Sequence, residues 1–392
     1  MSNRTLGIAV VGLGGAVGTT MAAGVELLKK GLIDTAGLPL AEFADAGLAE
    51  YTNIKFAGWD LFGEHLANAA GEHDVLTHKQ FVAVEDELRK IKPWSAAGND
   101  RFLSNIEGEN RLGKGTHREL IDKIRADLRS FGAACDSVVV INLASTEKLA
   151  AEGNEIFNSI AGFEQALDDN SEDISPAMLY AYAAIAEKIP YGNFTPSVAG
   201  DVRALIEFAA ANNVPIAGKD GKTGQTFIKT VLAPALRSRA LHVDGWYSTN
   251  ILGNRDGLAL SNEDSLASKV KTKSSVLEDI LGYPVEDHIV DIRYYRPRGD
   301  NKEAWDNIDI SGFLGQPMQI KVNFLCKDSI LAAPLAIEIA RCLDLAKRRG
   351  EGGIQEQLSV FFKLPMTDKA HPEQAFHKQE KMLIEWLSEP FA

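Results

Sequence analysis

The 392-residue chain has little that would suit a secreted or nucleic-acid-binding protein. Its three cysteines, Cys135, Cys326 and Cys342, are an odd number without metal-ligand spacing, which argues against a disulfide framework and fits a reducing compartment. Lysine and arginine number 41 against 54 aspartates and glutamates, so the formal net charge is −13. A chain this acidic is a poor general binder of nucleic acid or anionic membrane. An anionic substrate would therefore need basic residues that gather locally.

The chain also lacks a continuous apolar segment long enough to cross a membrane. The stretch from Thr5 to Val25 follows Arg4 and carries no charge, a pattern that resembles a signal peptide. Glycines break this stretch where a targeting or membrane-spanning helix must be continuous, namely Gly12, Gly14, Gly15 and Gly18. We therefore expect a cytoplasmic protein.

Strand-like and helix-like segments alternate over about the first 220 residues. Short, buried-type strands are expected at 6–11, 53–58, 137–142 and 214–217, and helices from the first glycine turn to residue 30, over 116–131, from Ser175-Pro176 onward and over 201–212. This alternation predicts an α/β protein with a Rossmann-like, doubly wound parallel sheet.

The pattern changes near His242. Longer strands rich in aromatic and β-branched residues are expected at 242–252, 287–295 and 318–325, with helices at 262–281 and 329–347 and a last strand at 358–364. We expect residues 227–337 to form an inserted α+β domain on an open sheet, for catalysis and oligomerisation. Residues 1–226 and 338–392 would then form the nucleotide-binding domain.

The first glycine-rich segment runs from Gly12 to Gly18, directly after a strand and before a helix. In that context the glycines let the backbone approach a dinucleotide pyrophosphate, which the helix N-terminus favours. The alternative is a tight turn that binds nothing. An acid about 20 residues further on normally binds the ribose; Asp34 has that spacing without a strand end, whereas Asp60 ends the second strand. Asp60 would favour NAD over NADP, unless it only caps a helix.

Two further segments could bind phosphate. Gly218 to Thr226 joins a strand to a helix with small residues, two hydroxyls and a lysine, although it lacks the P-loop order and could be a simple loop. Lys269, Lys271 and Lys273 concentrate positive charge in an acidic chain. Lys269 and Lys273 would share a helix face and repel each other by a few tenths of a kcal/mol unless an anion lies between them. A solvated helix face is the alternative.

Taken as a set, these and other segments resemble the myo-inositol-1-phosphate synthase family, in the same order from Gly12 to Lys363. The segments are the GxGGxxG turn, Ile174-Ser175-Pro176, Asn193-Phe194-Thr195-Pro196, Lys222-Thr223-Gly224-Gln225-Thr226, Asn250 to Gly257, Lys269 with Lys273, Gly299-Asp300-Asn301-Lys302, Lys327-Asp328-Ser329 and Phe362-Lys363-Leu364-Pro365. The chain length and the amino-acid sequence from Asn142 to Glu147 resemble those of the shorter, archaeal and bacterial branch of the family.

The resemblance implies an isomerase of inositol biosynthesis, and with it phospholipid biosynthesis, that turns D-glucose 6-phosphate into 1L-myo-inositol 1-phosphate. The implied steps are oxidation at C5, enolisation, intramolecular aldol cyclisation and reduction at C5, with NAD regenerated in each cycle. A homotetramer is also implied. The resemblance leaves open whether a divalent metal or a monovalent cation takes part, because Ile251 replaces a histidine and Lys327 an acid of the long-form pattern.

The resemblance also assigns site residues. The catalytic set is Lys269, Lys273, Lys302, Lys363, Asp220, Asp256 and Asp328. The cofactor set is Gly12, Gly14, Gly15, Ala16, Val17, Asp60, Ala144, Thr146 and Asp220. The substrate phosphate is expected at Thr223, Gly224, Gln225, Thr226, Asn254, Lys273 and Lys302. Ammonium groups in a water-poor site suit the oxyanions of this reaction, and a buried lysine with a lowered pKa can also move protons.

Two other functions stay open at this point. One is an ordinary NAD(P)-dependent dehydrogenase of a small hydroxy or amino acid, which would release NADH and needs no cluster of four lysines. The other is a non-catalytic NAD-binding regulator, for which loss of one of the lysines would be expected.

Overall fold

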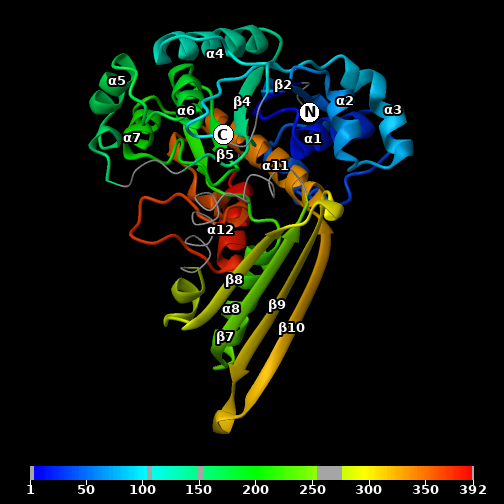
Figure 1. The fold of residues 1–392 in the computed structure, drawn as a ribbon, viewed down its shortest axis with the longest axis vertical. Coiled ribbons are helices and arrows are strands. Elements are labelled where there is room, and N and C mark those ends of the chain that lie inside the picture. Colours follow the sequence, from blue (N-terminus) through cyan, green and yellow to red (C-terminus); the bar gives the residue numbers. More distant parts are fainter. Residues whose placement is uncertain (1–3, 104–107, 149–152, 254–275, 391–392) are drawn as a thin grey trace.

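The computed structural model describes residues 4–103, 108–148, 153–253 and 276–390, whose strands form two sheets (Figure 1). The larger sheet has seven strands in the order β11 (Gly353–Ile354), β6 (Pro215–Gly218), β5 (Tyr191–Asn193), β4 (Ser137–Asn142), β1 (Leu6–Val11), β2 (Ile54–Asp60) and β3 (Trp94–Ser95). All neighbouring strands in it are parallel. The predicted doubly wound parallel sheet is therefore confirmed.

Helices cover both faces of this sheet, so its central strands are buried on both sides. The helices of this region are α1 (Ala16–Lys29), α2 (Leu66–His73), α3 (His78–Arg89), α4 (His117–Gly132), α5 (Ile160–Asp168), α6 (Pro176–Ala186), α7 (Arg203–Ala211) and α11 (Asp328–Arg349). One face packs against α1 and α11, where Ile8 and Val10 are buried. The other face packs against α4 and α6, where Ala9 and Val140 are buried.

Local sequence explains where several of these helices begin. The Ser175 hydroxyl accepts the Met178 amide at the N-terminus of α6, and Pro176 occupies the first helical position. Thr116 and Glu119 form a capping box at the start of α4. The expected helix at 116–131 and the strand at 137–142 are thus confirmed.

The smaller sheet is mixed and extends away from the helical body as a long arm (Figure 1). Its order is β10 (Pro317–Lys327), β9 (Asn301–Ser311), β7 (His242–Leu252) and β8 (Asp287–Tyr294). The β10–β9 and β9–β7 pairs are antiparallel, and β7–β8 is parallel. Helix α8 (Gln225–Ser238) and residues 276–281, which are helical, cover one face with Trp246 and Ile308 in the core.

The chain returns to the larger sheet after β10. Helix α11 packs against β4, β5 and β6, and β11 joins the edge of the sheet beside β6. The expected strand at 358–364 is wrong: Glu356–Phe361 form a 3-10 helix, and only an isolated bridge pairs Phe362 with Gly221. Its apolar run is buried by packing rather than by strand pairing. The last helix, α12 (Phe376–Ser388), packs on this 3-10 helix and on α8.

Two other findings concern the expected elements. Of the helix expected at 262–281, only residues 276–281 lie within the described part. Among the described residues, no helix is both long enough and apolar enough to cross a membrane.

Candidate active site

A cavity of about 440 Å³ lies at the carboxyl ends of the parallel strands. Ligands of open α/β sheets bind at this edge, next to the point where strand order reverses. In this sheet the order reverses at β1: the chain continues from β1 to β2 and β3 on one side, and β4, β5 and β6 lie on the other side. The walls come from the loops after β1, β2, β4, β5 and β6, and from the starts of β9 and α11.

The turn after β1 is built for close approach of a ligand. Gly12 has φ of 85°, and a Cβ at this position would lie 2.9 Å from the Cα of Ala144. Gly15 is the N-cap of α1 and supplies no side-chain hydrogen bond to the helix. The first amides of α1 therefore face a position that suits an anion.

Asp60 supports this turn from the end of β2. Its side chain is 8% exposed, and its Oδ2 accepts the Gly14 amide at 2.8 Å while Oδ1 accepts the Phe62 amide at 3.0 Å. The cap of the following helix, α2, is His65, so Asp60 does not act as the helix N-cap. Asp34 is exposed and does not line the cavity. Of the two acids, only Asp60 is placed to meet a ribose.

Two lysine–carboxylate pairs meet at the cavity from different parts of the chain. Lys363 Nζ lies 2.7 Å from Asp220 Oδ1, and Lys302 Nζ lies 3.3 Å from Asp328 Oδ1. All four residues line the cavity. Lys302 comes from β9 of the mixed sheet, whereas Lys363 follows the 3-10 helix at 356–361. Since each ammonium faces a carboxylate, the site combines positive charge with groups that hold it in place.

Besides Asp220, the loop after β6 contributes the side chain of Thr223 and a helix N-terminus. Thr223 lines the cavity and donates its hydroxyl to Asp328 Oδ1 at 3.2 Å. Gly224 is the N-cap of α8, without a side-chain cap, and a Cβ there would lie 4.0 Å from Lys302 Nζ. The Gln225 amide group is engaged by β7 and β9, donating to the carbonyl oxygens of Thr249 and Trp305. Gln225 and the buried Thr226 can therefore offer an anion their backbone amides.

Lys222, in the same loop, points away from the cavity. Its side chain is 3% exposed, its ammonium donates to Gln379 Oε1, and it lies 5.7 Å from the centre of the Phe376 ring. Burial lowers the pKa of Lys222 to about 7. Lys222 thus connects this loop to α12 and does not reach the cavity.

Several expected site residues lie outside the described part of the chain: Lys269, Lys273, Asn254 and Asp256.

The two departures from the long-form pattern, Lys327 and Ile251, lie away from the site. The Lys327 ammonium donates to the carbonyl oxygen of Val75 at 2.9 Å, just after α2. Ile251 lies in β7 opposite Glu303. Neither position lines the cavity. Within residues that the structure describes, no group of three or more His, Cys, Asp or Glu side chains is placed to hold a metal ion.

Sequence reasoning did not assign Glu147, Asp300 or His73, which also line the cavity. Asp300 accepts the Ser329 amide and hydroxyl at 3.2 and 2.7 Å and fixes the start of α11. The His73 Nε2 lies 2.9 Å from the Gly14 carbonyl oxygen. Asp300 and Glu147 stand inside segments that carried the family resemblance, whereas no sequence signal marked His73.

The cavity suits a dinucleotide. The uncapped N-terminus of α1 fits a pyrophosphate. On one side of Gly12, Asp60 has the position expected for an acid that binds a ribose. The loop with Ala144 and Thr146 lies on the other side of Gly12 from Asp60. Asp220 Oδ2 is buried and has no hydrogen-bond partner among the described residues, so it can still accept a ribose hydroxyl.

Comparison with known proteins gives matches over nearly the whole chain. A family model described as myo-inositol-1-phosphate synthase matches residues 38–388. Inositol-3-phosphate synthase 1 of Bacteroides thetaiotaomicron is 44% identical over 97% of this chain and 94% of its own length. Inositol-3-phosphate synthase isozyme 1 of Arabidopsis thaliana is 30% identical over 96% of this chain and 84% of its own length.

Solved structures agree with these sequence matches. The crystal structure of inositol-3-phosphate synthase from Caenorhabditis elegans has a TM-score of 0.91, with 25% identity over 98% of this chain and 85% of that one. A myo-inositol-1-phosphate synthase-related protein from Thermotoga maritima has a TM-score of 0.83, with 25% identity over 99% of this chain and 100% of that one.

Proposed function

The chain belongs to the myo-inositol-1-phosphate synthase family, and from this premise we propose that it isomerises D-glucose 6-phosphate to 1L-myo-inositol 1-phosphate with a bound, recycled NAD. The observation that carries the proposal is the meeting of two lysine–carboxylate pairs, Lys363–Asp220 and Lys302–Asp328, in a cavity that also contains a dinucleotide-type glycine turn. A plain dehydrogenase needs the turn but not both pairs.

The cofactor would lie across β1. The backbone amides of Ala16 and Val17 would hold the pyrophosphate, and the glycines Gly12, Gly14 and Gly15 would let it approach the backbone closely. Asp60 would bind the adenosine ribose. Ala144, Thr146 and Asp220 would hold the nicotinamide half. When bound, NAD supplies a hydride acceptor for C5 of the substrate and returns the hydride at the end of the cycle. A carboxylate at Asp60 repels a 2′-phosphate, so NAD is preferred to NADP.

The lysines carry the substrate chemistry. Oxidation at C5, enolisation and aldol closure create negative charge on successive oxygens, and preorganised ammonium groups stabilise such charge in a water-poor site. Lys363 faces the C1 and C5 oxygens, and Lys302 contacts the phosphate beside Thr223 and the α8 N-terminus. Asp220 and Asp328 orient these two lysines. Lys269 at the C5 hydroxyl, Lys273 and Asn254 at the phosphate, and Asp256 complete the proposal from the family resemblance.

The proposed division into domains follows the two sheets. The return of α11 and β11 to the parallel sheet supports one domain built from 1–226 and 338–392 and a second from 227–337. The boundary at 337 falls inside α11, which runs from Asp328 to Arg349 without a break. A hinge between the domains would therefore lie nearer residue 328.

A homotetramer is proposed for the assembly. The mixed sheet has one face covered by α8 and one face turned away from it. The strand register places Ile289, Tyr247, Trp305 and Leu325 together on the face turned away from α8. Ile289, Trp305 and Leu325 are exposed, at 50%, 37% and 61%. Exposed apolar surface of this kind marks an association face. The three free cysteines support a cytoplasmic location.

The family resemblance also leaves room for a cation, either a divalent metal or a monovalent ion, as an alternative role for Asp220 or Asp328, although the described residues offer no group of three acids, histidines or cysteines that would hold a metal. The experiment for the whole proposal is incubation with glucose 6-phosphate and NAD. Inositol phosphate should form without NADH accumulation, with EDTA and exchange of the monovalent salt as separate arms for the cation. NADH accumulation without inositol phosphate would instead indicate a dehydrogenase.

A further inference from the structure

The floor of the cavity contains a buried ionisable group that the proposed chemistry does not use. Glu147 lies in the loop that follows β4, is 4% exposed and lines the cavity. Its Oε1 accepts the Ala177 amide at 3.0 Å, in the first turn of α6. Its Oε2 is buried without a hydrogen-bond partner in the described part of the chain.

A network of neutral polar groups fixes the Glu147 backbone. The Glu147 amide donates to Ser197 Oγ at 2.9 Å, and the Ser197 carbonyl oxygen accepts Asn193 Nδ2 at 2.7 Å. Thr195 Oγ1 donates to Asn193 Oδ1 at 2.9 Å. Ala177 and Ser197, which directly follow the segments at 174–176 and 193–196 of the family resemblance, thus hold Glu147 at the cavity.

Sheet order places Glu147 on one particular side of a bound dinucleotide. Asp60 ends β2 on one side of β1, whereas the loops after β4, β5 and β6 lie on the other. With the adenosine ribose at Asp60 and the pyrophosphate at Gly12 to Gly15, the nicotinamide half extends over the ends of β4 to β6. Glu147 belongs to that half of the cavity.

We propose that Glu147 is a positioning residue whose carboxylate charge makes the site prefer the oxidised, cationic nicotinamide over the reduced, neutral one. This inference rests on the proposed use of NAD. The physical reason is that the nicotinamide ring changes from a charge of +1 to 0 on reduction, and a fixed negative charge in a low-dielectric site stabilises only the cation. The effect acts through space, so Glu147 need not touch the ring.

The titration of Glu147 supports this role. Burial raises its pKa to about 7, against the opposing hydrogen bonds from Ser175 and Ala177. The titratable groups facing it from α6 and β5 are Tyr180 and Tyr191, whose pKa values burial raises well above the usual range, so both stay neutral. Charged groups on the nearby loops form ion pairs, Lys219 with Asp201 and Lys363 with Asp220. In the half of the cavity beyond β4, Glu147 therefore supplies a charge that changes near neutral pH, whereas the imidazole of His73 lies at the Gly14 side and would act on both redox forms of the dinucleotide alike.

The experiment measures the dissociation constants of NAD and NADH by calorimetry for the intact protein at pH 6 and pH 8. For the wild type, NAD should bind more tightly at pH 8 than at pH 6, because the cation favours ionised Glu147, while NADH affinity stays flat. In Glu147→Gln the NAD-to-NADH affinity ratio at pH 8 should fall about tenfold, which corresponds to a coupling of about one pKa unit. A ratio that is the same at pH 6 and pH 8 in the wild type would overturn the inference without any variant.

Ser197→Ala is the matched control, because it removes the acceptor of the Glu147 amide and leaves the carboxylate and its own hydrogen bonds in place. It should change both affinities by one common factor. An equal loss of both affinities in Glu147→Gln, or an equal ratio change in Ser197→Ala, would show that Glu147 has only a structural role. A wild type that binds neither dinucleotide would overturn the proposed function itself, and a wild type that makes inositol phosphate with an unchanged ratio in Glu147→Gln would overturn only this inference.

Discussion

At the scale of residues, the site depends on ammonium groups that carboxylates hold in place. Lys302 comes from β9 and Lys363 from the segment after the 3-10 helix at 356–361, yet both reach one cavity, each within hydrogen-bonding distance of an acid. Because the acids neutralise part of the charge, the cavity wall is not purely cationic. The expected mutual repulsion of four lysines is therefore reduced for the two that the structure describes.

Replacing either lysine should reduce turnover strongly. Lys302→Ala and Lys363→Ala should each lower kcat by at least about 100-fold, as loss of one preorganised oxyanion donor does. The double variant should lose much less than the product of the two single losses, because the groups act as a unit. The measurement is the rate of inositol phosphate formation.

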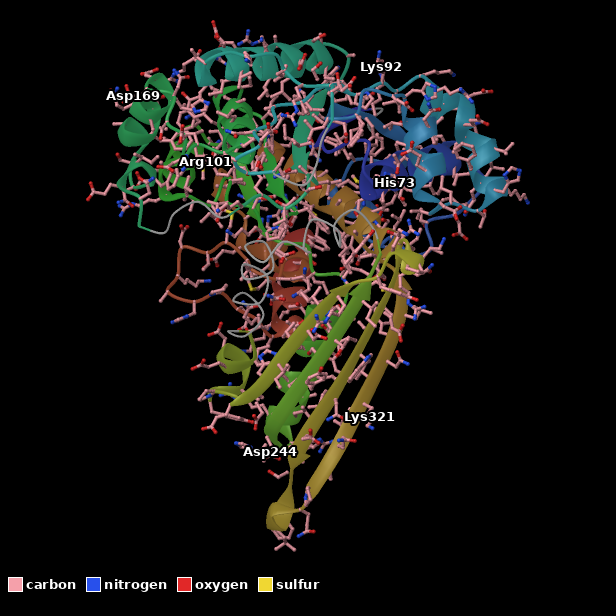
Figure 2. The ribbon with its side chains drawn as sticks, viewed as in Figure 1. His73, Lys92, Arg101, Asp169, Asp244 and Lys321 are labelled. Carbon is pink, nitrogen blue, oxygen red and sulfur yellow. The ribbon has the colours of Figure 1, made fainter. Side chains whose placement is uncertain are left out.

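Lys92→Ala is the control for charge alone, since Lys92 is exposed on the helical body, away from the mixed sheet (Figure 2). It should keep wild-type turnover. Near wild-type rates in a folded Lys302→Ala or Lys363→Ala variant would remove that lysine from the proposed chemistry.

Replacing Asp60 should change both cofactor choice and stability. Asp60→Ala removes the repulsion of a 2′-phosphate, so the preference for NAD over NADP should shrink at least about tenfold. It also leaves the amides of Gly14 and Phe62 without their acceptor, which should cost about 1–3 kcal/mol in the free energy of unfolding. Dissociation constants for both dinucleotides and a urea titration check the two effects. An unchanged preference would separate Asp60 from the ribose.

Sequence reasoning predicted some residues of the site and missed others for a physical reason. Asp60 and Asp220 end strands, and strand ends can be placed from hydrophobic pattern. Glu147 also follows a strand, but its burial depends on α6 and on the 193–197 loop, which are distant in sequence. The direction of Lys222 is set by α12, about 150 residues away, so local sequence gives no sign of it.

At the scale of elements, α12 is tied to the phosphate loop by a buried lysine. Lys222 has a pKa of about 7 in the folded protein, against about 10.5 in an unfolded chain. Between these values the unfolded chain binds more protons, so stability rises with pH, by at most about 1.4 kcal/mol per pH unit from this group. Below pH 7 the folded state carries the full free-energy cost of burying the charged Lys222.

Lys222→Met should therefore show a smaller gain in stability than the wild type between pH 7 and pH 9. Burial also lowers the pKa of Lys229, to about 8. Because Lys229 is present in both proteins, part of the rise in stability with pH remains in Lys222→Met. Urea titrations at pH 7, 8 and 9 give the comparison, with Lys321→Met as an exposed control that should follow the wild type. Parallel pH profiles for Lys222→Met and the wild type would show that Lys222 is charged in the folded state.

Element prediction succeeded where hydrophobic pattern and pairing agree. Strands β4 and β7 have the predicted bounds, because both have apolar runs that a sheet buries. Strand β9 was not predicted, since the buried Asp306 interrupts its alternation and accepts hydrogen bonds from Trp246 and Ser248 across the sheet. Such pairing becomes visible only in the folded sheet.

At the scale of the whole molecule, the exposed face of the mixed sheet predicts an assembly. The protein should have four times the 42.5 kDa mass of the chain in light scattering. Trp305→Glu introduces charge beside Tyr247, whose ring centroid is 5.5 Å from that of Trp305, and should give smaller species. Asp309→Asn, on the same strand, is the control and should stay tetrameric. A Trp305→Glu protein of unchanged mass would place the interface elsewhere.

The central claim is that one cavity removes a hydride from C5 of glucose 6-phosphate and returns it to the same carbon. The most direct measurement uses glucose 6-phosphate deuterated at C5, with NAD at about one equivalent per site, and mass spectrometry of the inositol phosphate formed over many turnovers. The account predicts that each product molecule retains its deuterium and that no reduced cofactor accumulates. Deuterium that appears in solvent or in a growing pool of reduced cofactor would contradict it.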